Sequence, residues 1–244
     1  MTIAQLREIL QLSTALVTCE PMILVPGQGM SDADMASILA LVETSAQRHN
    51  LDFSLWHRWP RRAGRALSHK WKPANSLISE PRKIDEDRYL LDLLIDDACE
   101  LMGDHQTGQH LQGMLLVEAV RQSFLAVTEA FFLPQDGTRY YFIFNNIAAE
   151  YKKFLFPLAA QLHYRVCDRE VSASSRRFTV EVGVEQAAGE AVRVSGIFTV
   201  VKDRSLRKME EALAKEALAG HYAQLAANRD GVGPAPPPEV AHAG

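Results

Sequence analysis

GMLLVEAVRQSFLAVTEAFFL, residues 113–133, is the stretch that decides the fold. It predicts a helix that is apolar almost all the way round, and such a helix is normally buried. Glu118, Arg121 and Gln122 nevertheless share one face, because residues three and four apart on a helix are neighbours. Buried charges are costly unless they are paired. Two interpretations are open: Glu118 and Arg121 neutralise each other structurally, or they line a site for a polar substrate.

The approach to this helix is polar and punctuated by glycines. It reads GDHQTGQHLQG over residues 103–113 and contains His105 and His110. A loop that enters a helix N-terminus directs backbone N–H groups and the positive end of the helix dipole at whatever lies there. Near Gly113, these groups would polarise a thioester or ester carbonyl, and His110 or Glu118 would supply acid–base chemistry. For His110 the alternative is a histidine that only hydrogen-bonds the backbone, and for His105 the alternative to a role in the site is a structural or exposed side chain.

Composition excludes several classes of protein. The chain has 244 residues, 47% hydrophobic and 23% charged, which is typical of a globular protein with a sizeable core. A net charge of −4 argues against nucleic-acid binding by bulk electrostatics. The three cysteines are widely spaced and predict neither a metal site nor a disulfide framework, so a reducing cytoplasm fits. We expect no signal peptide, no membrane span, no metal and no cofactor.

The N-terminal part, residues 1–74, is predicted to be a helical extension that ends in a basic segment. Residues 57–72 read HRWPRRAGRALSHKWK and include Arg61 and Arg62, but no acidic residue. The segment either binds an acidic protein or a phosphate group, or is a solvated basic loop.

Strand patterns follow the predicted helix. Residues 178–184 and 192–200 alternate apolar and polar side chains, which predicts an antiparallel sheet covered on one face by the apolar helix. The fold class is therefore α+β, with an antiparallel sheet wrapped around a long buried helix over residues 75–203. Residues 204–228 predict a C-terminal surface helix. The Pro- and Gly-rich end, residues 229–244, predicts a disordered tail.

The order of these elements is that of a hotdog fold, and one motif narrows the family. HLQGMLLVEAVRQSF closely resembles the helix motif of the A-factor biosynthesis hotdog proteins, in which a histidine, a Gly-Met step and a Glu-Ala-x-Arg-Gln core occur at this spacing. The likeness covers about residues 75–202. The residues that match this motif position by position are His110, Gly113, Met114, Glu118, Ala119, Arg121 and Gln122.

The resemblance implies an acyltransferase that moves a β-ketoacyl group from an acyl carrier protein, or from a coenzyme A thioester, to the hydroxyl of dihydroxyacetone phosphate. The product leads to a butenolide, the precursor of γ-butyrolactone-type signals. The same resemblance implies that Glu118 and Arg121 are active-site residues. The signalling synthases that this chain resembles typically carry two such repeats, whereas this chain carries one, so the resemblance implies a homodimer.

Residue roles follow as expectations. Glu118, Arg121 and His110 would be catalytic, and Arg121 would hold Glu118 ionised or bind a substrate phosphate. The expected substrate-binding residues are Gly113, Met114, Gln122, His105, Asn145, Arg61 and Arg62. Asn145 is either a turn or bulge residue or points toward the site.

Other reactions remain open for the same site. A thioesterase would use water in place of the hydroxyl acceptor. Dehydration is less favoured, because the catalytic histidine of the similar hotdog dehydratases aligns with Gly108. A non-catalytic acyl-binding module is the remaining alternative.

Overall fold

The structure is a computed structural model that describes residues 1–15, 20–102, 108–187 and 189–231. A six-stranded sheet forms its largest part, with the strand order β3-β4-β6-β7-β8-β5 and antiparallel pairing between all neighbours. The strands are β3 (Arg82–Lys83), β4 (Arg88–Asp92), β5 (Tyr140–Tyr151), β6 (Gln161–Val171), β7 (Ser175–Gln186) and β8 (Gly189–Lys202).

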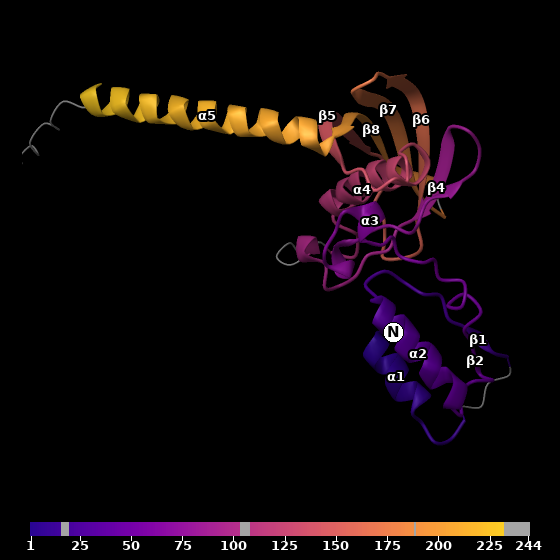
Figure 1. Ribbon diagram of the computed structural model, residues 1–244. Helices are drawn as coiled ribbons and strands as arrows, with labels where there is room; N and C mark the ends of the chain where they lie inside the picture. Colours follow the sequence, from indigo (N-terminus) through magenta and orange to yellow (C-terminus); the bar gives the residue numbers. More distant parts are fainter. Residues whose placement is uncertain (16–19, 103–107, 188, 232–244) are drawn as a thin grey trace, which may run out of the picture.

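The long helix α4 (Gly113–Phe131) packs on the inner face of this sheet (Figure 1). Its centre is Phe124, which is fully buried and stacks on Phe198 of β8 with ring centroids 5.3 Å apart. The inward side chains of β7 are Phe178, Val180, Val182 and Val184, as the alternating sequence pattern predicts, and all four are fully buried. The predicted sheet wrapped around a buried helix is therefore confirmed.

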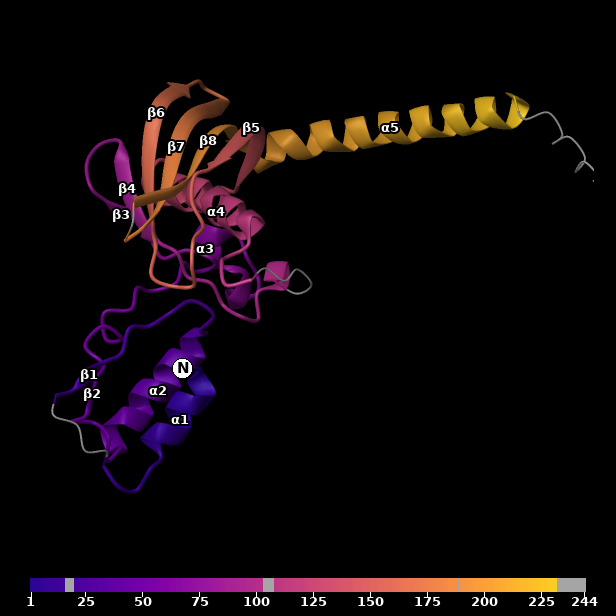
Figure 2. The same ribbon diagram turned by 180° about the vertical axis from the view of Figure 1, so that it is seen from behind.

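A second, smaller core lies at the N-terminal end of the chain. It is built by α1 (Ile3–Leu10) and α2 (Asp32–Thr44) together with a parallel pair of short strands, β1 (Met22–Ile23) and β2 (Leu51–Asp52). Ser31 caps α2 by accepting a hydrogen bond from the backbone N–H of Asp34, as a serine before a helix does. The predicted helical extension is confirmed, and Figure 2 shows it beyond one end of the sheet.

The segment between the two cores runs along α4. It contains the short helix α3 (Arg65–Ser68) and the 3-10 turn η1 (Pro73–Asn75), and a second 3-10 turn, η2 (Glu100–Met102), contacts η1. Ala63, Leu77 and Ile78 belong to the core of the sheet and α4. This segment therefore covers a side of α4 that the sheet leaves open.

The C-terminal helix α5 (Asp203–Gly231) continues directly from β8. Both views show that it leaves the sheet on the β5 side and runs away from the rest of the chain (Figures 1 and 2). The predicted C-terminal helix is confirmed and continues to Gly231, and residues 232–244, which contain most of the predicted tail, lie outside the described residues. No helix in the described ranges is both long and apolar enough to cross a membrane.

The packing of α4 makes one glycine essential. A Cβ atom added at Gly196 would lie 2.6 Å from two carbons of the Phe124 ring, which is fixed in the core. We expect Gly196→Ala to lower the free energy of unfolding by about 1–3 kcal/mol, the usual cost of overpacking. Urea denaturation measures this change.

Gly183→Ala on β7 is the matched control. The atoms nearest to its Cβ would all belong to the side chain of Glu190, with Oε2 at 2.7 Å. This carboxylate pairs with Lys152 and Arg193 near the surface and can shift, unlike the Phe124 ring in the core. We expect Gly183→Ala to lower the free energy of unfolding by less than about 0.5 kcal/mol. Glycine is itself unfavourable inside a strand, so its replacement by alanine offsets part of the contact with Glu190. Equal costs for the two variants would contradict the close approach of Phe124 to β8.

Candidate functional site

Glu118 is the centre of a polar cluster on α4. Its carboxylate accepts two hydrogen bonds from Arg121, at 2.6 Å from Nε and 2.8 Å from Nη2. Lys70 Nζ lies 2.7 Å from the same carboxylate, and Gln122 Nε2 donates to it at 3.0 Å. Two cations and an amide therefore hold one carboxylate.

Gln122 ties this cluster to the segment that covers α4. Its side chain is fully buried, its Oε1 accepts from the backbone N–H of Leu77 at 2.8 Å, and its Nε2 donates to the carbonyl of Asn75 at 2.8 Å. The amide of Gln122 is thus enclosed and bonded within the chain, and it also contacts Glu118. Its predicted role in substrate binding stays a prediction.

The pKa of Glu118 is lowered from its ordinary value of 4.5 to about 2. Burial raises the pKa of this carboxyl, but the hydrogen bonds from Arg121, Lys70 and Gln122 and the charge of Arg121 outweigh it. Glu118 is therefore a stable carboxylate at neutral pH and a weak base.

Lys70 was not among the residues predicted from the sequence. It follows His69, whose φ of 55° is in the left-handed region, at the end of α3. His69 Nε2 lies 3.0 Å from Glu129 and Lys70 contacts Glu118, so two consecutive side chains match two carboxylates on α4. The sequence offered one indication of these contacts. Residues 57–72 contain no acidic side chain, so their cations can form ion pairs only with residues outside this segment.

Apolar side chains extend this cluster on its exposed side. Arg121 lies over the ring of Phe144 on β5, with its Cζ 5.7 Å from the ring centroid. Met114, one turn before Glu118 on the same face of α4, is 65% exposed. Ile147 and Tyr151, farther along β5, are also exposed. We call Met114, Phe144, Ile147 and Tyr151 the apolar strip. A charged cluster and an apolar surface thus lie side by side.

The N-terminus of α4 borders a pocket of about 420 Å³. Tyr151 closes one side and donates from its hydroxyl to the carbonyl of Gly113 at 3.0 Å. His110 packs against Phe154 with ring centroids 4.6 Å apart. No side chain of the described residues caps the first turn of α4. His110 and Gly113 therefore both line a cavity at the positive end of the helix dipole.

A model of the A-factor biosynthesis hotdog domain matches residues 52–202. The chain belongs to the A-factor biosynthesis hotdog family. Membership supports a hotdog enzyme that acts on acyl thioesters. The match begins before residue 75, where the hotdog domain was predicted to start, so the basic segment and the Lys70 contact fall within the family region.

Solved structures with a similar fold are more distant. A mutant thioesterase from Pseudomonas aeruginosa is 13% identical over 51% of this chain and 81% of its own, with a TM-score of 0.37. A thioesterase from Haemophilus influenzae is 10% identical over 51% and 78%, with a TM-score of 0.37. The PaaI protein of the E. coli phenylacetic acid degradation operon is 10% identical over 50% and 81%, with a TM-score of 0.35. No curated protein matches the chain.

Asn145 does not belong to the cluster. It occupies a bulge in β5 between Phe144 and Asn146, and its Oδ1 accepts from the hydroxyl of Thr199 at 2.8 Å. Thr199 alternates with the inward-facing Phe198, so it lies on the face of the sheet away from α4. The bulge interpretation is confirmed, and the prediction that Asn145 contacts substrate stays a prediction.

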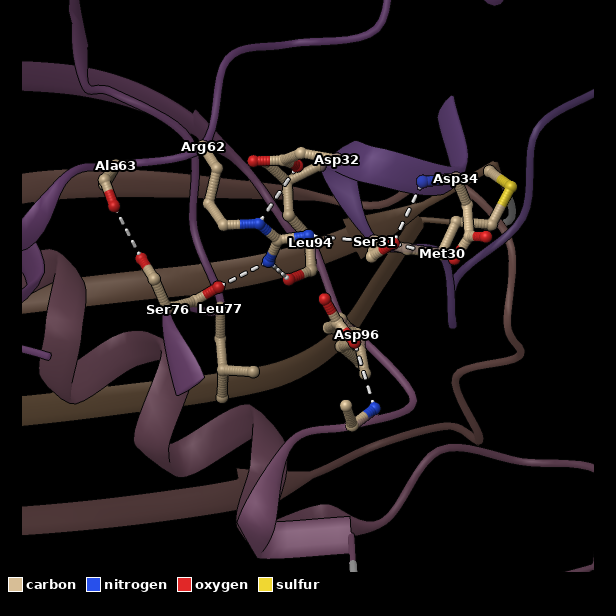
Figure 3. A network of polar contacts seen from close by, with 12 residues as sticks. Met30, Ser31, Asp32, Asp34, Arg62, Ala63, Ser76, Leu77, Leu94 and Asp96 are labelled. Atoms are coloured by element: carbon tan, nitrogen blue, oxygen red, sulfur yellow. Dashed lines mark hydrogen bonds and ion pairs between the residues drawn. The ribbon is translucent and has the colours of Figure 1, made fainter. Parts of the chain in front are cut away.

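Arg62 is buried between the two cores (Figure 3). Its Nη1 donates to the carbonyls of Ser76 and Leu94 at 2.5 and 2.6 Å, and its Nε donates to Asp32 of α2 at 3.2 Å. The guanidinium of Arg62 is enclosed and joins α2 to the backbone of Ser76 and Leu94, and the predicted role of Arg62 in substrate binding stays a prediction. Arg61 is exposed and lies 3.4 Å from Glu80, so it remains open to a partner.

His105 lies outside the described residues, so its predicted role stays a prediction. Among the residues that are described, no group of three or more His, Cys, Asp or Glu side chains is arranged to hold a metal ion.

Replacing Arg62 tests whether its hydrogen bonds hold the two cores together. We expect Arg62→Met to lower the free energy of unfolding by about 2–4 kcal/mol, because buried carbonyls of Ser76 and Leu94 lose their donor. Arg61→Met, on the adjacent exposed residue, is the matched control and should cost less than about 0.5 kcal/mol. Chemical denaturation measures both variants. A decrease in the free energy of unfolding at Arg62 no larger than that at Arg61 would contradict this stabilising role of Arg62.

The lowered pKa of Glu118 predicts a pH dependence of stability. A carboxyl whose pKa is lower in the folded state contributes stability above its unfolded pKa and loses it as the pH falls toward its folded pKa. Wild-type stability should therefore exceed that of Glu118→Gln most above pH 5. The difference should shrink between about pH 4.5 and pH 2, by at most about 1.4 kcal/mol per pH unit. A difference that is independent of pH, measured by urea denaturation, would refute the assigned ion cluster.

Proposed function

We propose that the protein transfers a β-ketoacyl group from an acyl carrier protein or coenzyme A thioester to the hydroxyl of a phosphorylated acceptor such as dihydroxyacetone phosphate. The product would lead to a butenolide or γ-butyrolactone-type signal or a related secondary metabolite. The observation that carries this proposal is the Lys70–Glu118–Arg121 cluster beside the apolar strip, on the motif helix of an A-factor biosynthesis hotdog protein.

The cluster suits an anionic acceptor. Two cations and one carboxylate leave a net charge of +1, and Glu118 takes only two of the five N–H donors of the guanidinium. The side chains of Lys70 and Arg121 are 26% and 29% exposed. Both can therefore meet a phosphate, and Arg121 can do so with paired donors. The apolar strip would hold the acyl chain.

The N-terminus of α4 suits the thioester. Its first-turn N–H groups, near Gly113, would stabilise the negative charge that develops on the carbonyl oxygen. The acceptor oxygen attacks the carbonyl carbon and the C–S bond breaks. We assign the base to His110, which takes the hydroxyl proton and returns it to the thiolate. Glu118 is less suited to be a base, because its pKa is about 2. It holds Arg121 and Lys70 in place instead.

We further propose that two copies pair through β5. This strand has 12 residues and pairs with β8, and it is an edge of the sheet in the described residues. An exposed edge strand with apolar side chains invites another strand. Antiparallel pairing of two β5 strands would supply the second hotdog unit that the two-repeat synthases of the family lead us to expect. The carrier protein or coenzyme A would approach the exposed Arg61. We place the reaction in the cytoplasm and expect neither nucleic acid nor a membrane to take part.

The reaction is tested by incubating the protein with a β-ketoacyl carrier thioester, with and without dihydroxyacetone phosphate, and recording mass spectra of the products. We expect an ester with the acceptor. Free β-keto acid in equal yield with and without acceptor would make the protein a thioesterase, and loss of water from a 3-hydroxyacyl substrate would make it a dehydratase. An unchanged thioester that still binds the protein would make it an acyl-binding module.

Arg121→Lys should reduce the rate of ester formation by about 10–100-fold, because lysine cannot bind Glu118 and phosphate with paired donors. Arg165→Lys is the matched control: Arg165 also pairs with a carboxylate at 2.6 Å, but with Glu181 on the outer face of the sheet. Its rate should stay within about twofold of the wild type. Equal rates for the two variants would remove Arg121 from the active site.

A further inference from the structure

α5 is longer than its contacts with its own chain require. It has 29 residues, which corresponds to about 43 Å. Leu206 is buried at its base, whereas five large apolar side chains farther along are exposed. These side chains are Met209, Leu213, Leu218, Tyr222 and Leu225. An isolated helix is marginal in water without packing on an apolar face. The outer part of α5 therefore needs a partner surface.

The base of α5 fixes its direction. The backbone N–H of Asp203 donates to the carbonyl of Arg139 at 3.0 Å, immediately before β5 begins at Tyr140. From there α5 runs past β5, away from its own sheet, in both views (Figures 1 and 2). This is the side on which a second sheet would continue if two β5 strands paired. A six-stranded sheet is only about 24 Å wide, so α5 would cross all of it.

Antiparallel pairing determines what α5 meets there. In such a pair the Tyr140 end of one β5 lies beside the Tyr151 end of the other. The chain that follows Tyr151 has three exposed apolar side chains: Phe154, which is 70% exposed, Phe156 and Leu158. Of these, Phe154 lines the pocket at the N-terminus of α4.

We propose that α5 is an arm that crosses the subunit junction and lies over residues 151–158 of a second copy, where it closes that copy's pocket at the N-terminus of α4. The inference rests on the proposed pairing of β5. Both surfaces carry exposed apolar side chains. Each site would then be completed by the other subunit.

Cross-linking between two different variants tests this arrangement. Leu213→Cys and Phe154→Cys are made separately in the full chain with Cys19→Ser and Cys167→Ser, and Cys99 is kept because it is buried. After subunit exchange in the mixture, a short bismaleimide should join the two variants into a product of twice the chain mass. Leu213→Cys mixed with Val171→Cys is the matched control and should give no product. Val171 is also exposed, but the same pairing places it at the opposite end of the partner sheet.

Dimer dissociation gives a second readout. By sedimentation, Leu213→Glu should raise the dissociation constant about tenfold or more, because it places a charge in an apolar contact. Lys208→Glu should change it less than about threefold, because the residues three and four positions from Lys208 include none of the five exposed apolar side chains.

The possible failures are distinct. A dimer that forms without the Leu213–Phe154 product, or with equal products at Phe154 and Val171, overturns the arm and leaves the pairing of β5. A wild-type monomer overturns both the arm and the pairing. Neither outcome depends on ester formation, which tests the reaction separately.

Discussion

α4 is apolar on nearly all sides, and the sheet covers only one of them. The segment that contains Ala63 and Leu77 covers a second side, and Gln122 joins it to the helix through the backbone of Asn75 and Leu77. A buried amide is tolerated only when its donors and acceptor are paired. The position of Glu118, and through it of Lys70 and Arg121, therefore depends on a segment that precedes the sheet in the sequence. The family match, which begins at residue 52, includes this segment.

The parts of the fold that were predictable are periodic. β7 and β8 alternate strictly, and the covering helix is apolar throughout, so local pattern alone indicates that they pack together. The path of residues 57–78 has no such period. Its position is set by contacts with distant partners, such as Arg62 with the carbonyl of Leu94 and Lys70 with Glu118. The local sequence does not indicate these distant partners. The basic residues of the segment were therefore equally compatible with a solvated loop.

The candidate site also has a part that the local sequence predicts and a part that distant contacts determine. Glu118 and Arg121 lie three residues apart on one helix, so their pairing was predictable, but the strongly lowered pKa of Glu118 also needs Lys70 and Gln122. Asn145 shows the opposite case. The sequence is compatible with a bulge residue or with a side chain that points toward the site. A bulge at this residue shifts the register of β5, and the side chain bonds Thr199 on the outer face. The single extra residue of the bulge determines which face the side chain occupies, and the alternation of apolar and polar residues in the sequence does not reveal it.

The two interpretations of the Glu118–Arg121 pair do not exclude each other. Gln122, at the inner end of the cluster, is fully buried, whereas Met114, on the outer side, is largely exposed. Between them, Glu118 is held from within by Gln122 and in turn holds Lys70 and Arg121, which are partly exposed. The inner bonds are structural, and their effect is to fix two cations at an apolar surface before any ligand arrives. Such preorganisation is what binding and stabilising an anion requires, because the side chains do not have to be ordered at the moment of binding. A pair that neutralised itself completely would lack the second cation, and Lys70 therefore turns a structural ion pair into a candidate site.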